Sequence, residues 1–144
     1  MSGNSKGEEL IDKSNIRFYN AFESLSIEGM EEVWKHSGDI VCVHPGWDLF
    51  TGWMAIRESW VTIFQNTDKI QFHITNTKLR TFENIAIVIC LENIRTNINE
   101  GKIRMGVVAT NIFERQNNNS EEKWLMVHHH GSLVSNYVPP NPSL

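Results

Sequence analysis

The chain lacks the features that mark nucleic-acid-binding and disulfide-rich secreted proteins. Among its 144 residues only 2 are cysteines, and they have no C-x-x-C spacing. Its 13 lysines and arginines stand against 17 acidic residues, which gives a net charge of −4, and the basic residues form no cluster beyond isolated pairs. A protein that neutralises phosphates usually carries a continuous basic stripe. Nucleic acid is therefore not an expected partner.

Long apolar runs are also missing. The longest, Ile85 to Leu91, is far shorter than the roughly 20 residues that cross a bilayer, and residues 1–20 hold no apolar stretch of signal-peptide length. We therefore expect a soluble, cytoplasmic protein that does not enter membranes. In that compartment Cys42 and Cys90, each inside an apolar strand-like run, are expected to be free buried thiols.

No motif for a nucleotide or flavin cofactor is present. The sequence contains neither G-x-G-x-x-G nor G-x-x-x-x-G-K-[ST], the glycine-rich patterns that cradle dinucleotides and phosphates. We expect no cofactor. Any chemistry would then be proton transfer, as in isomerisation, dehydration or aldol-type cyclisation.

What the chain does contain is a change of hydrophobic period, from helical spacing in the first half to alternation from Ile70 onward. The expected helices are Glu8 to Leu25, Glu28 to about His36 and a segment capped by Thr51 or Gly52, with short strands at Asp39 to His44 and Asp48 to Phe50. The expected long strands are Ile70 to Phe82, Ile85 to Asn97, Lys102 to Arg115 and Glu122 to Val134. Because their links are short and polar, they should form antiparallel hairpins.

This pattern predicts one α+β domain. A chain of this length buries on the order of 68% of its unfolded surface, so a single core is expected. We predict a flexible N-terminus over residues 1–7, one domain over 8–135, and an extended proline-rich tail over 136–144 that contains YVPPNPSL.

Five short motifs occur in order: H-P-G-W from His44, F-T-G-W from Phe50, I-x-x-x-W from Ile56, V-A-T-N-I-F-E-R from Val108 and W-x-x-x-H-x-H-x-S from Trp124. By them the sequence resembles the nuclear transport factor 2-like superfamily over nearly its whole length, and most closely the SnoaL-like branch. The resemblance implies a cone-shaped, curled antiparallel sheet wrapped around three N-terminal helices, a cystatin-like roll. It implies no single function, because that cone hosts isomerases, dehydratases, cyclases and binding domains.

The N-terminal half is also similar to the ketosteroid isomerases, and the similarity implies catalytic positions. Their proton-shuttling aspartate corresponds to His44, and an imidazole can also move protons near neutral pH. Their two oxyanion donors correspond to Phe18 and Asn111. Asn111 can donate through its amide, Phe18 cannot, and Tyr19 should point about 100° away around the helix. His44 and Asn111 are therefore the catalytic candidates, and steroid isomerisation is not expected.

Strand alternation predicts which side chains line the cone. Asn111 shares a face with Met105, Val107, Ala109 and Phe113, a mostly apolar set around one amide. The other face of that strand is apolar too, which predicts a homodimer through the outer sheet face. On the last strand, strict alternation places His128 and His130 together, and we expect them on the concave side.

Further ligand contacts are expected from residues near the mouth of the cone. Trp47 follows Pro-Gly in a loop, and Trp60 is either core or cavity lining. Phe18 is a further candidate ligand contact. Arg95, with Asn93 and Asn97 on one strand face, is a candidate anion contact at the cavity opening. His44, His128 and His130 could form a three-histidine metal site, but no carboxylate partner is evident from the spacing, so no metal is expected.

Two functions from different classes remain open. The first is a pocket for a small organic ligand in the cone, with cofactor-free proton transfer. The second is an assembly module, because the closing motif W-x-x-V-H-x-H-x-S is similar to the association domain of calcium/calmodulin-dependent kinase.

Overall fold

The computed structural model describes residues 6–98, 101–118 and 121–140. Over these residues the helices are α1 (Lys6–Glu23), α2 (Ile27–Val33) and α3 (Trp53–Gln65). The strands are β1 (Val41–Val43), β2 (Leu49–Thr51), β3 (Lys69–Thr81), β4 (Ile85–Ile98), β5 (Gly101–Asn118) and β6 (Glu121–Leu133). No helix in the described ranges is long and apolar enough to cross a membrane.

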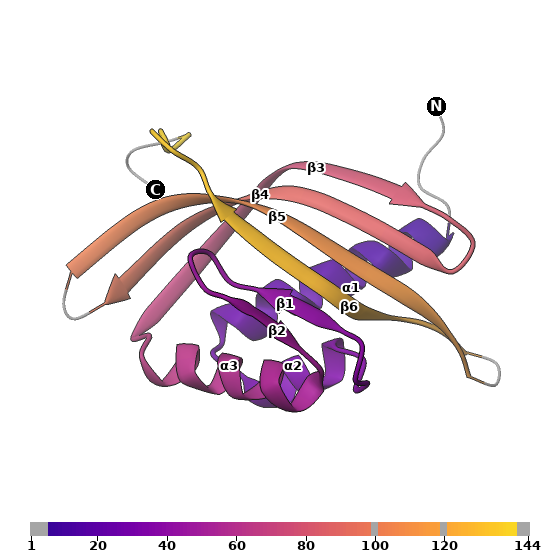
Figure 1. Cartoon of the computed structure of the whole chain (residues 1–144). Helices are drawn as coiled ribbons and strands as arrows, with labels where there is room; N and C mark the ends of the chain where they lie inside the picture. Colours follow the sequence, from indigo (N-terminus) through magenta and orange to yellow (C-terminus); the bar gives the residue numbers. More distant parts are fainter. Residues whose placement is uncertain (1–5, 99–100, 119–120, 141–144) are drawn as a thin grey trace.

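The strands form one curled sheet in the order β2-β1-β6-β5-β4-β3. Strands β3 to β6 pair as successive antiparallel hairpins, whereas β1 runs parallel to β6. The sheet arches over the helices, and α1 crosses its concave side while α2 and α3 lie below (Figure 1). The predicted α+β cone is therefore confirmed, with the one difference that the sheet is mixed.

The helices begin where the sequence provides caps. Ser26 precedes α2 and accepts a hydrogen bond from the Gly29 amide (2.9 Å). Gly52 precedes α3 with a φ of 89°, a conformation that favours glycine. The prediction that the second helix runs to about His36 was wrong, because Trp34 adopts an extended backbone and the Lys35 amide bonds to the Met126 carbonyl (2.9 Å).

A bulge in β6 changes which residues face the core. Ile112 of β5 pairs with His128 of β6, but the next residue, Phe113, pairs with Met126, so Val127 is an extra residue. A bulge of this kind reverses the alternation of side chains beyond it. Met126 and His129 are consequently both buried.

The concave side is packed with side chains. Phe18, Trp60 and Phe113 are fully buried there, and the Phe18 ring centroid lies 5.7 Å from that of Trp60 in an edge-on arrangement. Edge-on aromatic contacts of this kind stabilise a core beyond the area they bury. The cysteines are free and buried, as predicted.

Candidate functional site

The first part of the site is His44, which directly follows β1. The His44 carbonyl accepts a bond from the Trp47 amide (2.9 Å), and Gly46 between them has a φ of 81°. Proline at the second position and glycine with positive φ at the third match a type II turn. The turn places the Trp47 ring edge-on to the imidazole, with centroids 5.0 Å apart, and Trp47 remains 40% exposed.

The imidazole of His44 is held in one orientation by Ser59. His44 Nε2 lies 2.9 Å from Ser59 Oγ, and that hydroxyl donates to the Ile56 carbonyl at 2.6 Å. Because the hydroxyl proton is used by Ile56, Nε2 carries the proton that Ser59 accepts, and Nδ1 is left unprotonated. The buried Cys42 Sγ lies 4.0 Å from Nδ1 and 3.7 Å from Nε2. Burial lowers the pKa of His44 to about 4, so the ring is neutral at pH 7.

Trp60 forms the wall beside His44. The Trp60 ring is fully buried and edge-on to the imidazole, with centroids 4.6 Å apart. Its indole Nε1 has no hydrogen-bond partner in the described part of the chain. A buried donor without an acceptor costs free energy, so this group calls for an explanation, and an acceptor oxygen of a bound molecule would supply one.

A second polar cluster surrounds Asn111 on β5. Asn111 Nδ2 donates to Asn15 Oδ1 (2.9 Å) and to the Tyr19 hydroxyl (3.1 Å). Asn111 Oδ1 lies 2.6 Å from His129 Nδ1, which must be the donor because a carbonyl oxygen accepts. Both amide hydrogens and the carbonyl of Asn111 are thus engaged by the protein itself.

The cluster continues from Tyr19 to a buried carboxyl group. The Tyr19 hydroxyl donates to Glu92 Oε2 at 2.6 Å and lies 3.4 Å from Cys90 Sγ. Burial raises the pKa of Glu92 to about 7, against the opposing effect of the Tyr19 hydrogen bond. The chain from His129 through Asn111 and Tyr19 to Glu92 therefore ends in a group that can hold or release a proton near neutral pH.

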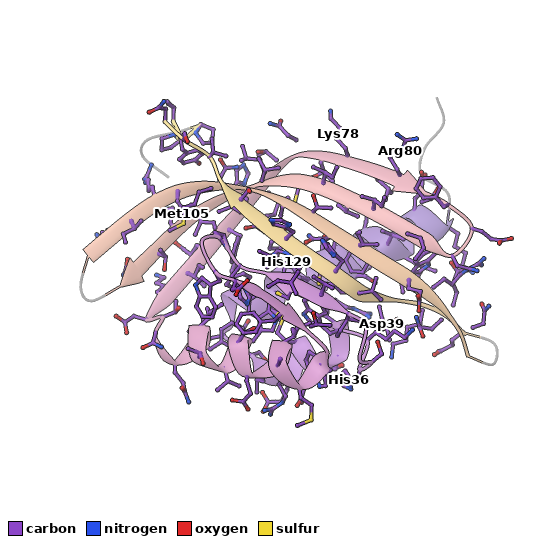
Figure 2. All side chains as sticks on the ribbon, viewed as in Figure 1. His36, Asp39, Lys78, Arg80, Met105 and His129 are labelled. Carbon is purple, nitrogen blue, oxygen red and sulfur yellow. The ribbon has the colours of Figure 1, made fainter. Side chains whose placement is uncertain are left out.

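His129 connects the two parts of the site. Its ring lies between the sheet and α3 in Figure 2, with centroids 4.8 Å from Phe18 and 6.0 Å from Trp60. In the sheet it pairs with Cys42, two residues before His44. Burial and the nearby His44 hold the pKa of His129 well below its usual value, so His129 is also neutral.

The prediction that His128 and His130 lie on the concave side was wrong. The bulge at Val127 turns both to the outer face, where their ring centroids are 6.3 Å apart, and it turns His129 inward. His44 therefore lies on the opposite side of the sheet from the other two members of the suggested three-histidine site. Among the described residues, no group of three metal-ligating side chains is close enough to hold an ion.

Arg95 is also placed elsewhere than expected. It shares a face with Asn93, as predicted, but that face is the outer one, since the alternate residues Glu92 and Ile94 are buried on the inner face. Phe18, Trp60, Phe113, Asn111 and His44 are brought together on the concave side with Trp47 at its edge.

Sequence reasoning missed Tyr19, Glu92, Asn15, Ser59 and His129. A signal existed for Glu92, because the inward alternation of β4 through Ala86, Val88 and Cys90 continues to it. Tyr19 is 5% exposed although it neighbours the fully buried Phe18 on the helix. The sheet curls around α1, so two adjacent helix positions are covered.

Comparisons with known proteins agree with this architecture. A family model for the SnoaL-like domain matches residues 11–136. F-box protein SKIP8 of Arabidopsis thaliana is 26% identical over 120 residues, which are 83% of this chain but 48% of that protein, so the chain spans about half the length of this relative.

Two solved structures are similar over most of their length. A protein from Streptomyces avermitilis, provisionally named a dehydratase of the nuclear transport factor 2-like family, is 29% identical with a TM-score of 0.80, covering 88% of this chain and 95% of that one. A protein from Thiobacillus denitrificans, provisionally named a calcium/calmodulin-dependent protein kinase type II association domain, is 26% identical with a TM-score of 0.75, covering 85% and 94%. Since the family model spans most of the chain and the fold agrees with it, the chain belongs to the SnoaL-like domain family of the nuclear transport factor 2-like superfamily.

Proposed function

We propose that the concave site binds a small organic ligand through a carbonyl-type oxygen and moves a proton on it without a cofactor. The observation that carries this proposal is the indole N–H of Trp60, which has no hydrogen-bond partner among the described residues and lies beside the neutral imidazole of His44. A hydrogen-bond donor and a proton acceptor are then carried by two buried rings in contact with each other, and the His44 ring also contacts the partly exposed Trp47. Together they are the minimum that enolisation of a carbonyl compound requires.

The proton step follows from the orientation of His44. Nδ1 takes the proton from the carbon next to the ligand carbonyl, and the electron pair left behind forms the enolate. The Trp60 N–H donates to the enolate oxygen, where the negative charge develops. Return of the proton from Nδ1 to another carbon completes an isomerisation. In a dehydration the enolate electron pair forms the C=C bond as the bond to the β-oxygen breaks, and the proton on Nδ1 passes to that oxygen, so water leaves and His44 is again neutral. The Streptomyces relative provisionally named a dehydratase is consistent with this class of reaction.

Asn111 acts in this proposal as a positioning residue. Its amide already donates to Asn15 and Tyr19 and accepts from His129, so a ligand would have to displace one of these partners to reach it. We assign to it the task of holding His129 and Tyr19 against Phe18 and Trp60.

The test is a thermal-shift screen with small ketones, hydroxy ketones and aromatic polyketide-like compounds. A compound that raises the melting temperature of the wild type should fail to do so with Trp60→Phe, which keeps the ring and removes the N–H. Trp34→Phe is the matched control, because Trp34 Nε1 is also buried without a partner in the described chain, whereas the aromatic ring beside Trp34 is Trp53, with centroids 6.5 Å apart. Hits are then followed by NMR for exchange of the α-hydrogen with deuterium, which His44→Ala should abolish.

A second candidate function is assembly, and the outer sheet face favours it. Val108 and Ile89 are 44% and 40% exposed there, and the Thiobacillus relative is provisionally named an association domain. We propose that two copies pair through this face, since joining them would bury the apolar surface. Light scattering on Val108→Glu should then give half the mass of the wild type. Equal masses would refute the pairing.

A further inference from the structure

The turn between β1 and β2 rests on β6, beside which this hairpin lies (Figure 1). The contact is made by Pro45 of the turn and by Gly131, a buried residue that directly follows the three consecutive histidines of β6. A Cβ on Gly131 would lie 2.9 Å from Val107 Cγ1 and 3.1 Å from Pro45 Cγ. Because glycine has no Cβ, the proline ring can sit directly on the sheet. The first half of the turn therefore has a fixed seat.

The second half of the turn is held less firmly. The Trp47 amide donates to the His44 carbonyl (2.9 Å), and the Trp47 ring contacts the rings of His44 and Phe50, with centroids 5.0 and 5.9 Å away. Between Pro45 and Trp47, Gly46 has a φ of 81°, and apart from its chain neighbours no described atom lies within 4 Å of the place where a Cβ would be. Gly46 therefore has both the backbone freedom and the space to act as a hinge.

Three aromatic rings close off the His44 imidazole, which is only 3% exposed. The centroids of the Trp47, Phe50 and Trp60 rings lie 5.0, 6.1 and 4.6 Å from that of the imidazole. Trp60 is fully buried in α3, and Phe50 pairs with Cys42 in the sheet. Trp47 alone of the three lies in a turn and is substantially exposed. Moving it therefore uncovers the imidazole with the smallest loss of buried apolar surface.

We infer that Trp47 is a gate over His44 that opens at Gly46 while Pro45 stays seated on Gly131. The role of this gate rests on the proposed function, since what it admits is the ligand of the His44 site. A ring that returns over the bound ligand also keeps water away from the enolate during proton transfer. The two histidine-containing motifs of the sequence thus meet in one device, in which H-P-G-W supplies the gate and the glycine of H-H-H-G supplies its seat.

The test is the rate at which diethyl pyrocarbonate modifies each histidine of the full chain at pH 7, measured by mass spectrometry of peptides. An unprotonated imidazole nitrogen attacks a carbonyl carbon of this reagent, so the rate reports whether a small carbonyl compound reaches the ring. His44 and His129 are both neutral at this pH, because burial lowers their pKa values. The exposed His73 measures the reagent concentration. His129, labelled in Figure 2, pairs with Cys42 of β1 and reports whether the seat of the turn stays in place.

In the wild type, His44 should be modified more slowly than His73 but faster than His129, because the gate opens without unfolding of the sheet. Trp47→Ala should speed the modification of His44 about tenfold or more relative to His73, since the ring that covers it is gone. His129 should keep its wild-type rate in this variant.

Two further variants separate covering by the ring from a general effect on structure. Trp47→Phe keeps a ring over the imidazole, so His44 should be modified within about threefold of the wild-type rate. Phe82→Ala is the matched control, because it removes another exposed ring, directly after β3, and should leave the rate at His44 unchanged.

Three results would overturn the inference. The first is equal acceleration of His44 and His129 in Trp47→Ala, which would show that the whole structure has loosened. The second is an unchanged rate at His44 in that variant, and the third is a Trp47→Phe variant as fast as Trp47→Ala. No ligand takes part in this measurement, so its outcome is separate from the thermal-shift screen. The expected rates together with no binding of any carbonyl compound would support the gate and reject the proposed function.

Discussion

Replacing the buried carboxyl group of Glu92 by an amide should change how the stability of the protein depends on pH. Glu92→Gln keeps the shape of the side chain and an oxygen that can accept the Tyr19 hydroxyl (2.6 Å in the wild type). Burial raises the pKa of Glu92 from its ordinary 4.5 to about 7, so the folded protein retains a proton that the unfolded chain loses. The wild type is therefore stabilised by this proton below pH 4.5 and loses that stabilisation as the pH rises through 7.

The size of the effect follows from the difference between the two pKa values. Each unit corresponds to about 1.4 kcal/mol, so the wild type should lose about 2–3 kcal/mol of unfolding free energy through Glu92 between pH 5 and pH 8. Glu92→Gln has no carboxyl group at this position, so its unfolding free energy does not fall for this reason. The free energy of unfolding of the variant should thus rise relative to wild type by about that amount over the same range.

The assay is urea unfolding of both proteins at several pH values between 5 and 8. The buried histidines His44 and His129 titrate in the opposite direction, since burial lowers their pKa values. Both histidines are present in wild type and in Glu92→Gln, so their contributions cancel when the unfolding free energies of the two proteins are subtracted. Glu114→Gln is the control, because Lys35 lowers the pKa of this partly exposed carboxyl and its removal should give no gain at high pH. Parallel curves for wild type and Glu92→Gln would refute the reasoning.

Three other changes test the neighbouring contacts. Asn111→Ala removes the donor to Tyr19 and the acceptor of His129. Urea unfolding should show that the free energy of unfolding falls by about 3 kcal/mol or more, because both partners stay buried and unpaired. A fall of less than about 1 kcal/mol would contradict the network. Ser59→Ala removes the acceptor of the His44 Nε2 proton, and the free energy of unfolding should fall by about 1–3 kcal/mol in the same assay. An unchanged urea midpoint would disprove this. Gly106→Ala should displace Tyr137 from the sheet, which would be seen as faster amide hydrogen exchange in residues 134–138. Unchanged exchange there would show that the C-terminal segment is not held by this contact.

The order of elements was predictable because hydrophobic period and turn residues are local. Pro45 and Gly46 fix the end of β1, and the short polar links fix the hairpins of the four long strands. The parallel pairing of β1 with β6 is not local, since it joins residues more than eighty positions apart, and no spacing in the sequence signals it.

The contents of the site were only partly predictable. His44, Asn111, Phe18 and Trp60 are all buried inside the cone. Strand alternation and helical period indicated this for Asn111 and Trp60, whereas His44 and Phe18 were suggested by the resemblance to the ketosteroid isomerases. Their role in binding or catalysis stays a prediction. Alternation predicted that His128 and His130 face inward, but His129 does. The cause is the extra residue Val127, because a single inserted residue reverses the faces of the strand beyond it.

Basic residues on the outer face of the sheet show the converse limit. Along the chain Lys69, Arg95 and the pair Lys102 and Arg104 are separated, and the composition is acidic. Only the register of three strands brings Arg95 beside Arg104 and Lys69 into the row of Lys102. Charge patterning along a sequence therefore does not reveal clusters that are assembled across a sheet.

The central claim is that the Trp60 indole donates to a ligand oxygen beside His44. The direct measurement is the indole region of the ¹H–¹⁵N NMR spectrum, where the 5 tryptophans of the chain give separate signals and Trp60→Phe identifies the one that matters. On titration with a carbonyl compound that raises the melting temperature, the Trp60 signal should move downfield more than the Trp34 signal, because a hydrogen bond forms at Nε1. A ligand that binds while the Trp60 signal stays in place would contradict the account.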